Sequence, residues 1–199
     1  MIKKIIKILL IILLILVLAI FYLSVFGVKT NKFNNQISNN VLKFNKKINL
    51  ILSDVNYFLN PYNFTINIKT TNPQIILEGR KLEIKDIQTS VALKSLINDQ
   101  FSIDDLQITT KEIKVNDIIL LLRAFKDSPK LLVLNNFIKG GFIIANINLN
   151  FDEKGNIEED YKISGYAKKI KLNILNQVKL QNFNFNFNVD KSNYLLKEI

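Results

Sequence analysis

Apolar residues follow two different patterns along the chain. The 21 positions from Ile8 to Val28 contain no charged residue, whereas polar and apolar residues are mixed in the rest of the chain. A helix rises about 1.5 Å per residue, so this run forms a helix roughly 30 Å long, which matches the hydrocarbon core of a bilayer. We therefore expect a transmembrane helix here. The side chains expected to anchor it include Ile8, Leu14, Leu18, Phe21, Tyr22 and Val28.

The residues around this run indicate how it is oriented in the membrane and whether it is cleaved. Lys3, Lys4 and Lys7 precede it, and the cytoplasmic flanks of membrane helices are rich in Lys and Arg. A cleaved signal peptide has an apolar stretch of about 7–15 residues and a small-residue cleavage site, and Ser24–Gly27 fits such a site poorly. The sequence thus predicts an uncleaved signal anchor over residues 1–29. It makes a single pass through a bacterial inner membrane, with a cytoplasmic N-terminus and a periplasmic bulk.

The segment between the anchor and Pro61 has the period of a helix. Apolar residues recur there at spacings of three and four, as in Val41, Phe44, Ile48 and Ile51. This spacing places them on one face of a helix. We expect a helical connector over residues 30–60 that leads from the membrane to the domain.

After Pro61 the period changes to two. Runs such as Phe64–Ile68 and Ile143–Phe151 alternate apolar and polar residues and are bounded by Asn, Asp, Gly or Pro. This pattern is typical of an antiparallel sheet with one buried face. The alternation shifts by one position near Gln181–Asn182, which indicates a β-bulge. We expect a mainly β fold, with a curved, groove-like antiparallel sheet over residues 61–199.

Helices, a tight turn and an unfinished strand are also predicted. Residues 116–138 form a helical insert, in which Ser128–Pro129 starts a second helix and Gly140–Gly141 ends it. Asp152–Gly155 is a hairpin signal. A further strand begins at Tyr194–Ile199, so we expect either a longer protein of which this is the front part, or an edge that awaits a partner strand.

The amino-acid composition excludes several kinds of site. The chain has no Cys and no His, which excludes disulfides and thiolate or imidazole metal sites and removes the commonest general base. Its net charge is +10, but only Arg80 and Arg123 of its 27 basic residues are arginine, and the lysines are scattered. Nucleic-acid binding is therefore not expected. The consecutive carboxylates Glu158–Asp160 do not face one another as a catalytic pair does. We expect no catalytic residue, no cofactor and no metal site.

The apolar faces of the later strands are long, regular and rich in Ile and Phe. One interpretation is an ordinary core covered by a second sheet or by helices. The other is an open groove in which lipid tails replace the missing core, at about 0.8 kcal/mol per buried methylene. The candidate groove residues are Ile143, Ile147, Leu149, Phe151, Ile163, Phe183, Phe185 and Phe187.

In the order of its segments the chain resembles the AsmA-like superfamily of Gram-negative bacteria. The resemblance covers the anchor, the alternating strands over Phe64–Val115, the insert Val115–Phe125 and the string Ile138–Gly165. It implies an inner-membrane-anchored periplasmic protein of the bridge-like lipid-transfer type, with membrane lipids as partners and a role in lipid transport or outer-membrane biogenesis. Members are several times longer, so the resemblance implies an N-terminal portion or a short relative.

Two other functions stay open. An LptC-like relay component for lipopolysaccharide also has one anchor and a short periplasmic β-domain, although the helical insert at 116–138 fits it less well. A structural or assembly factor would instead offer its C-terminal β edge to a protein partner. It would present a flat exposed edge and carry no lipid.

Overall fold

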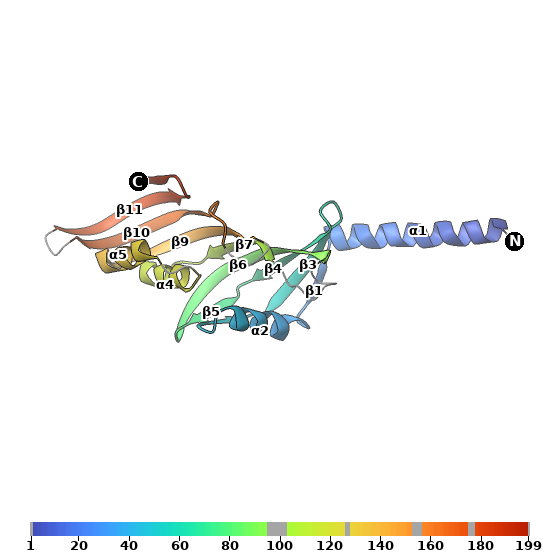
Figure 1. Ribbon diagram of the computed structural model, residues 1–199, viewed down its shortest axis with the longest axis horizontal. Coiled ribbons are helices and arrows are strands. Elements are labelled where there is room, and N and C mark those ends of the chain that lie inside the picture. Colours follow the sequence, from blue (N-terminus) through green and yellow to red (C-terminus); the bar gives the residue numbers. More distant parts are fainter. Residues whose placement is uncertain (1, 95–102, 126–127, 153–156, 175–177, 199) are drawn as a thin grey trace.

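The fold is a large open antiparallel β-sheet, from one end of which a long apolar helix projects (Figure 1). The computed structural model describes residues 2–94, 103–125, 128–152, 157–174 and 178–198. The described helices are α1 (Ile2–Val25), α2 (Asn34–Phe44), α4 (Val115–Phe125) and α5 (Pro129–Phe137). The strands are β1 (Val28–Thr30), β2 (Ile48–Ile51), β3 (Asp54–Asn60), β4 (Thr65–Thr71), β5 (Gln74–Leu77), β6 (Arg80–Ala92), β7 (Ile103–Thr110), β8 (Ile113–Lys114), β9 (Ile138–Asn150), β10 (Lys162–Ile174), β11 (Val178–Val189) and β12 (Tyr194–Glu198). The predicted fold class is confirmed.

Nine strands form the main path of the sheet, in the order β1-β3-β4-β6-β7-β9-β10-β11-β12. Strand β6 belongs to two layers, because Arg80–Glu83 pairs with β5 while Asp86–Ala92 pairs with β4. Strand β2 pairs with β5, so β2 and β5 form a small flap at the start of β6. The sheet is not closed, since β1 and β12 each have one neighbour.

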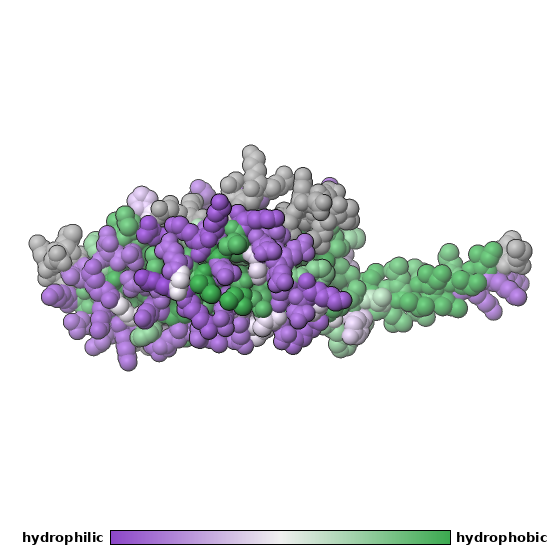
Figure 2. Space-filling view, turned by 90° about the horizontal axis from the view of Figure 1, so that it is seen from below, coloured by the Kyte–Doolittle hydropathy of each residue, from purple (hydrophilic) through white to green (hydrophobic). Residues whose placement is uncertain are grey.

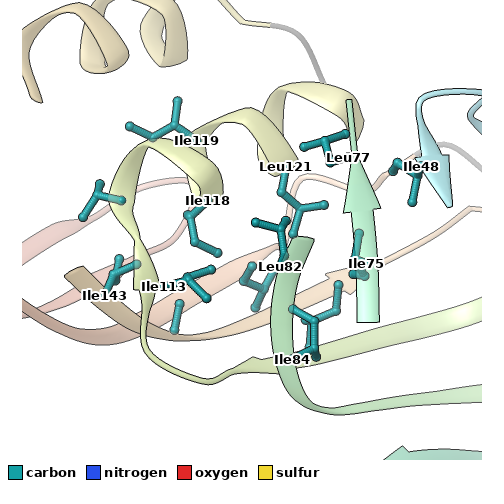
Figure 3. Close-up of a cluster of buried hydrophobic side chains, with 14 of the residues drawn as sticks. Ile48, Ile75, Leu77, Leu82, Ile84, Ile113, Ile118, Ile119, Leu121 and Ile143 are labelled. Atoms are coloured by element: carbon teal, nitrogen blue, oxygen red, sulfur yellow. The ribbon is translucent and has the colours of Figure 1, made fainter. Parts of the chain in front are cut away.

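Helix α4 and the flap bury one face of the sheet. Leu121 of α4 is fully buried and points toward Leu77 of the flap and Leu82 of β6 (Figure 3). Ile118 points from α4 toward Ile113 at the start of the insert. These residues belong to one apolar cluster that reaches from β2 to β10. The middle of the sheet therefore has an ordinary covered core.

The predicted insert at residues 116–138 is confirmed as the pair α4 and α5. Ser128 caps α5 by accepting a hydrogen bond from the Lys130 backbone N–H at 3.3 Å. Gly140 and Gly141 do not end this helix, because they lie inside β9. Gly141 has φ +124 beside a register shift between β9 and β10 and lies under Ile170, where a Cβ has no room. Gly141 is thus required by the packing of β9 against β10.

The predicted helical connector over residues 30–60 is correct only for α2. Its later residues form strands, because Ile48 and Leu50 are buried in alternation within β2 and β3 pairs on both of its sides. Two short strands and the turn between them therefore place apolar residues at spacings of three and four, as a helix would. Packing in the sheet overrode the local pattern.

The anchor helix ends earlier than the uncharged run. Helix α1 stops at Val25, Gly27 adopts φ +65, and Val28 is the first residue of β1. A Cβ on Gly27 would lie 2.7 Å from the Tyr57 carbonyl oxygen, so only glycine allows the chain to turn this close to β3. The helix and the sheet are thus joined with no flexible linker between them.

Two further predictions concern turns in the last strands. The bulge predicted near Gln181–Asn182 is present in β11, where the pairing with β10 shifts and Asn182 has φ +63. The hairpin predicted at Asp152–Gly155 lies mostly outside the described residues, which resume at Ile157 opposite Phe151.

Candidate functional site

One row of directly paired residues crosses all nine strands of the main path. It contains only aliphatic residues, threonine and tyrosine. The row is Thr30, Val55, Thr70, Ile87, Ile108, Ile147, Ile163, Val189 and Tyr194. At about 4.8 Å between strands this row is roughly 38 Å long. Directly paired residues point to the same side of a sheet, so the sheet has one continuous apolar face.

The neighbouring row points to the other side and is polar from β1 to β10. It contains Lys29, Asn56, Lys69, Gln88, Gln107, Asn148 and Lys162. A sheet with one apolar and one polar face can contact apolar material on one side and water on the other.

Part of the apolar face is covered, which corrects three of the candidate groove residues. Ile143, Ile147 and Leu149 of β9 are buried in the core under α4, so they do not line an open surface. Phe151, Ile163, Phe185 and Phe187 are partly buried against this core. These three residues therefore do not line an open groove, and the groove stays a prediction for the strands beyond β9.

The apolar face becomes exposed toward β11 and β12. Phe183 is 36% exposed, and Leu196, which pairs directly with Phe187, is 65% exposed. The Phe185 and Phe187 rings meet edge to face with centroids 6.4 Å apart. Phe187 lies over Gly165 of β10, whose missing side chain gives the ring its space. This end of the sheet is a partly exposed aromatic surface next to a covered core.

Helix α1 is a candidate membrane anchor. The most apolar 18-residue window within residues 3–25 has a mean hydropathy of 3.3, and none of this window is buried in the domain. Figure 2 shows α1 as a hydrophobic rod that ends in hydrophilic residues. The anchor residues named from the sequence all have exposed side chains: Ile8, Leu14, Leu18, Phe21, Tyr22 and Val28. Only Val28 lies outside the helix.

Carboxylates gather at the far end of the sheet but do not form a metal site. Glu158, Glu159 and Asp160 are exposed, and Glu159 pairs with Lys191. Two backbone N–H groups of the β11–β12 turn donate to Asp190 and lower the pKa of its carboxyl. Within the described residues no group of three acidic side chains is placed to hold a metal ion.

Asp104 and Asp105, another pair of neighbouring carboxylates, have separate surroundings. Burial, and to a lesser degree the charge of Asp105, raises the pKa of Asp104. Asp105 accepts a hydrogen bond from the Ser90 backbone N–H at 3.1 Å, across the β6–β7 pair. The Asp105 side chain thus links β6 and β7 by a hydrogen bond.

No protein-family model matches the chain, and no curated protein and no solved structure matches it. Its class is therefore defined by architecture alone. The protein has an N-terminal apolar helix, which is a candidate membrane anchor, and an open antiparallel sheet that is apolar on one face.

Sequence reasoning missed two parts of this surface. It identified the apolar face within the later strands but not its continuation through β3, β4 and β6 to the helix. It also missed Leu196, and the exposed aromatics Tyr62 and Phe64 in the turn between β3 and β4. The signal for Tyr62 and Phe64 was present, because residues 55–68 contain no charged side chain.

Proposed function

We propose that this protein is an inner-membrane-anchored, periplasmic protein of the AsmA-like type. In this proposal α1 spans the membrane, and the apolar face of the sheet shields lipid acyl chains during phospholipid transport or outer-membrane biogenesis. No catalytic step is part of this function. Any driving force comes from outside the chain.

The observation that carries the proposal is that the apolar face of the sheet is exposed at its β11–β12 end, at Phe183 and Leu196. A large apolar patch is rarely left open on a soluble domain without a partner. Lipid tails are a suitable partner, because each methylene removed from water contributes about 0.8 kcal/mol. In this proposal the membrane that α1 spans supplies lipid at the opposite, β1 end of the sheet.

The test uses two neighbouring leucines of β12. Leu195 and Leu196 are 63% and 65% exposed, but Leu196 pairs with Phe187 on the apolar face and Leu195 pairs with Asn188 on the polar face. Native mass spectrometry of the full chain, released from mild detergent, should detect bound lipid. We expect Leu196→Glu to lose it and Leu195→Glu to retain it. Lipid-free wild-type protein, or equal losses in both variants, would refute the proposal.

A second candidate function rests on the free edge of β12. Among the described residues this strand pairs with β11 alone, and both of its central leucines are exposed. Such an edge accepts a further strand from a protein partner. This alternative predicts that both leucine variants lose a protein partner and that neither of them affects lipid.

A further inference from the structure

We propose that the turn between β3 and β4 is a second membrane contact, in which Tyr62 and Phe64 lie in the interface of the bilayer that α1 spans. This inference rests on the anchoring of α1. It is independent of what occupies the apolar face.

The pairing of β1 and β3 places this turn beside the helix. Val28, just after α1, pairs with Tyr57, and β3 runs antiparallel to β1. Strand β3 continues for three residues past Tyr57, about 10 Å at roughly 3.3 Å per residue, before the turn. Phe58 and Ser24 line the same cleft, so β3 lies against the last turn of α1. Figure 1 shows the turn at this end of the domain.

The turn is built so that its aromatic side chains stay outside. The Asn60 side-chain oxygen accepts from the Tyr62 backbone N–H at 3.1 Å, and the Phe64 carbonyl accepts from the Leu93 backbone N–H at 2.9 Å. These bonds hold the backbone, while Tyr62 is 92% exposed and Phe64 is 70% exposed. Side chains exposed to this degree do not contribute to the core of the domain.

Lipid is the partner that fits this place and this composition. From Val55 to Ile68 the chain has 14 residues without a charge, so entry into the interface requires no charge to be desolvated. The last turn of α1 carries Tyr22, and Phe26 directly follows the helix. Their ring centroids are 5.3 Å apart, and both side chains are exposed. Tyrosine and tryptophan concentrate at the headgroup level of membranes. In this proposal Tyr62 and Phe64 of the turn lie beside Tyr22 and Phe26 in the interface of the bilayer.

Two contacts fix the orientation of the domain, whereas one helix alone leaves it free to tilt. A fixed orientation would hold the sheet at a constant angle to the bilayer. The consequence can be measured without knowing what the sheet binds.

The chain contains no tryptophan, so a single introduced tryptophan reports on one place. The full-length protein is reconstituted in phosphatidylcholine vesicles, either plain or brominated on the acyl chains near the headgroup. Three variants are compared. Tyr62→Trp tests the turn, Phe21→Trp reports on the anchor, and Leu195→Trp is the exposed control at the far end of the sheet.

We expect the bromine to quench Tyr62→Trp and Phe21→Trp strongly and to leave Leu195→Trp unchanged, with blue-shifted emission from Tyr62→Trp. If only Phe21→Trp is quenched, α1 is anchored and the inference is wrong. Equal quenching of Tyr62→Trp and Leu195→Trp would mean that the domain lies flat on the vesicle, which also overturns it. If Phe21→Trp is not quenched, the anchoring by α1 fails and the inference fails with it.

Discussion

Gly165 is the position where one added methyl group tests the geometry of the aromatic surface. A Cβ there would meet the Ile144 carbonyl oxygen of the neighbouring strand and would lie 2.9 Å from the Cζ atom of Phe187. The carbonyl belongs to the ladder between β9 and β10, so it moves only if the strands move. Overpacking of this kind costs about 1–3 kcal/mol, against a gain of about 0.4–1 kcal/mol from a less flexible unfolded chain.

The matched control is Gly140→Ala in β9. Its Cβ would meet only the Lys171 Cδ atom, at 3.7 Å, which is an ordinary contact. We therefore expect Gly140→Ala to be neutral or stabilising by about 0.4–1 kcal/mol. The two variants should differ by roughly 2 kcal/mol, which at about 2 kcal/mol per molar of urea separates their unfolding midpoints by on the order of 1 M. Urea titration of the full chain in detergent, followed by circular dichroism, measures this difference. Equal midpoints would show that the close approach of Gly165 to the Ile144 carbonyl of β9 is wrong.

Three further predictions test the core and the far turn. Thr110→Val should cost about 1–3 kcal/mol in a urea titration, because its hydroxyl accepts from a buried backbone N–H of β9 at 2.8 Å. Thr70→Val should be neutral or stabilising, since its buried hydroxyl has no partner among the described residues. Leu121→Ala should cost about 2–5 kcal/mol in the same titration, whereas Leu132→Ala, which is exposed on α5, should change stability by about 0.5 kcal/mol or less. A carbon-detected NMR titration should give Asp190 a pKa below the ordinary 3.8. Its contribution to the β11–β12 turn is present above that value and is lost as pH falls through the lower, folded-state pKa.

Period-two alternation predicted β9 well, because this strand has one covered and one open face. Residues 143–149 alternate in burial without exception, and their sequence alternates apart from the exposed Ile144. The same rule failed between residues 45 and 60, where two short strands and a turn produced the spacing of a helix. Short strands carry too few residues for their period to be recognised.

The extent of the candidate site depends on which strands pair with each other, and this cannot be read from the sequence. Ile147 and Phe187 have the same pattern within their own strands, yet α4 buries the first while the second lies near the open end. Which face a helical insert covers is decided by long-range contacts. For the same reason the position of the Tyr62 turn beside α1 follows only from the pairing of Val28 with Tyr57.

The central claim is that lipid tails occupy the open end of the apolar face. The direct measurement places the photo-crosslinker p-benzoylphenylalanine at Phe187, on that face, or at Asn186, its neighbour on the polar face of β11. The full chain is irradiated in native membranes, and crosslinked adducts are identified by mass spectrometry. We predict lipid adducts from position 187 and none from position 186. Adducts at both positions in equal amount, or at neither, would contradict the account.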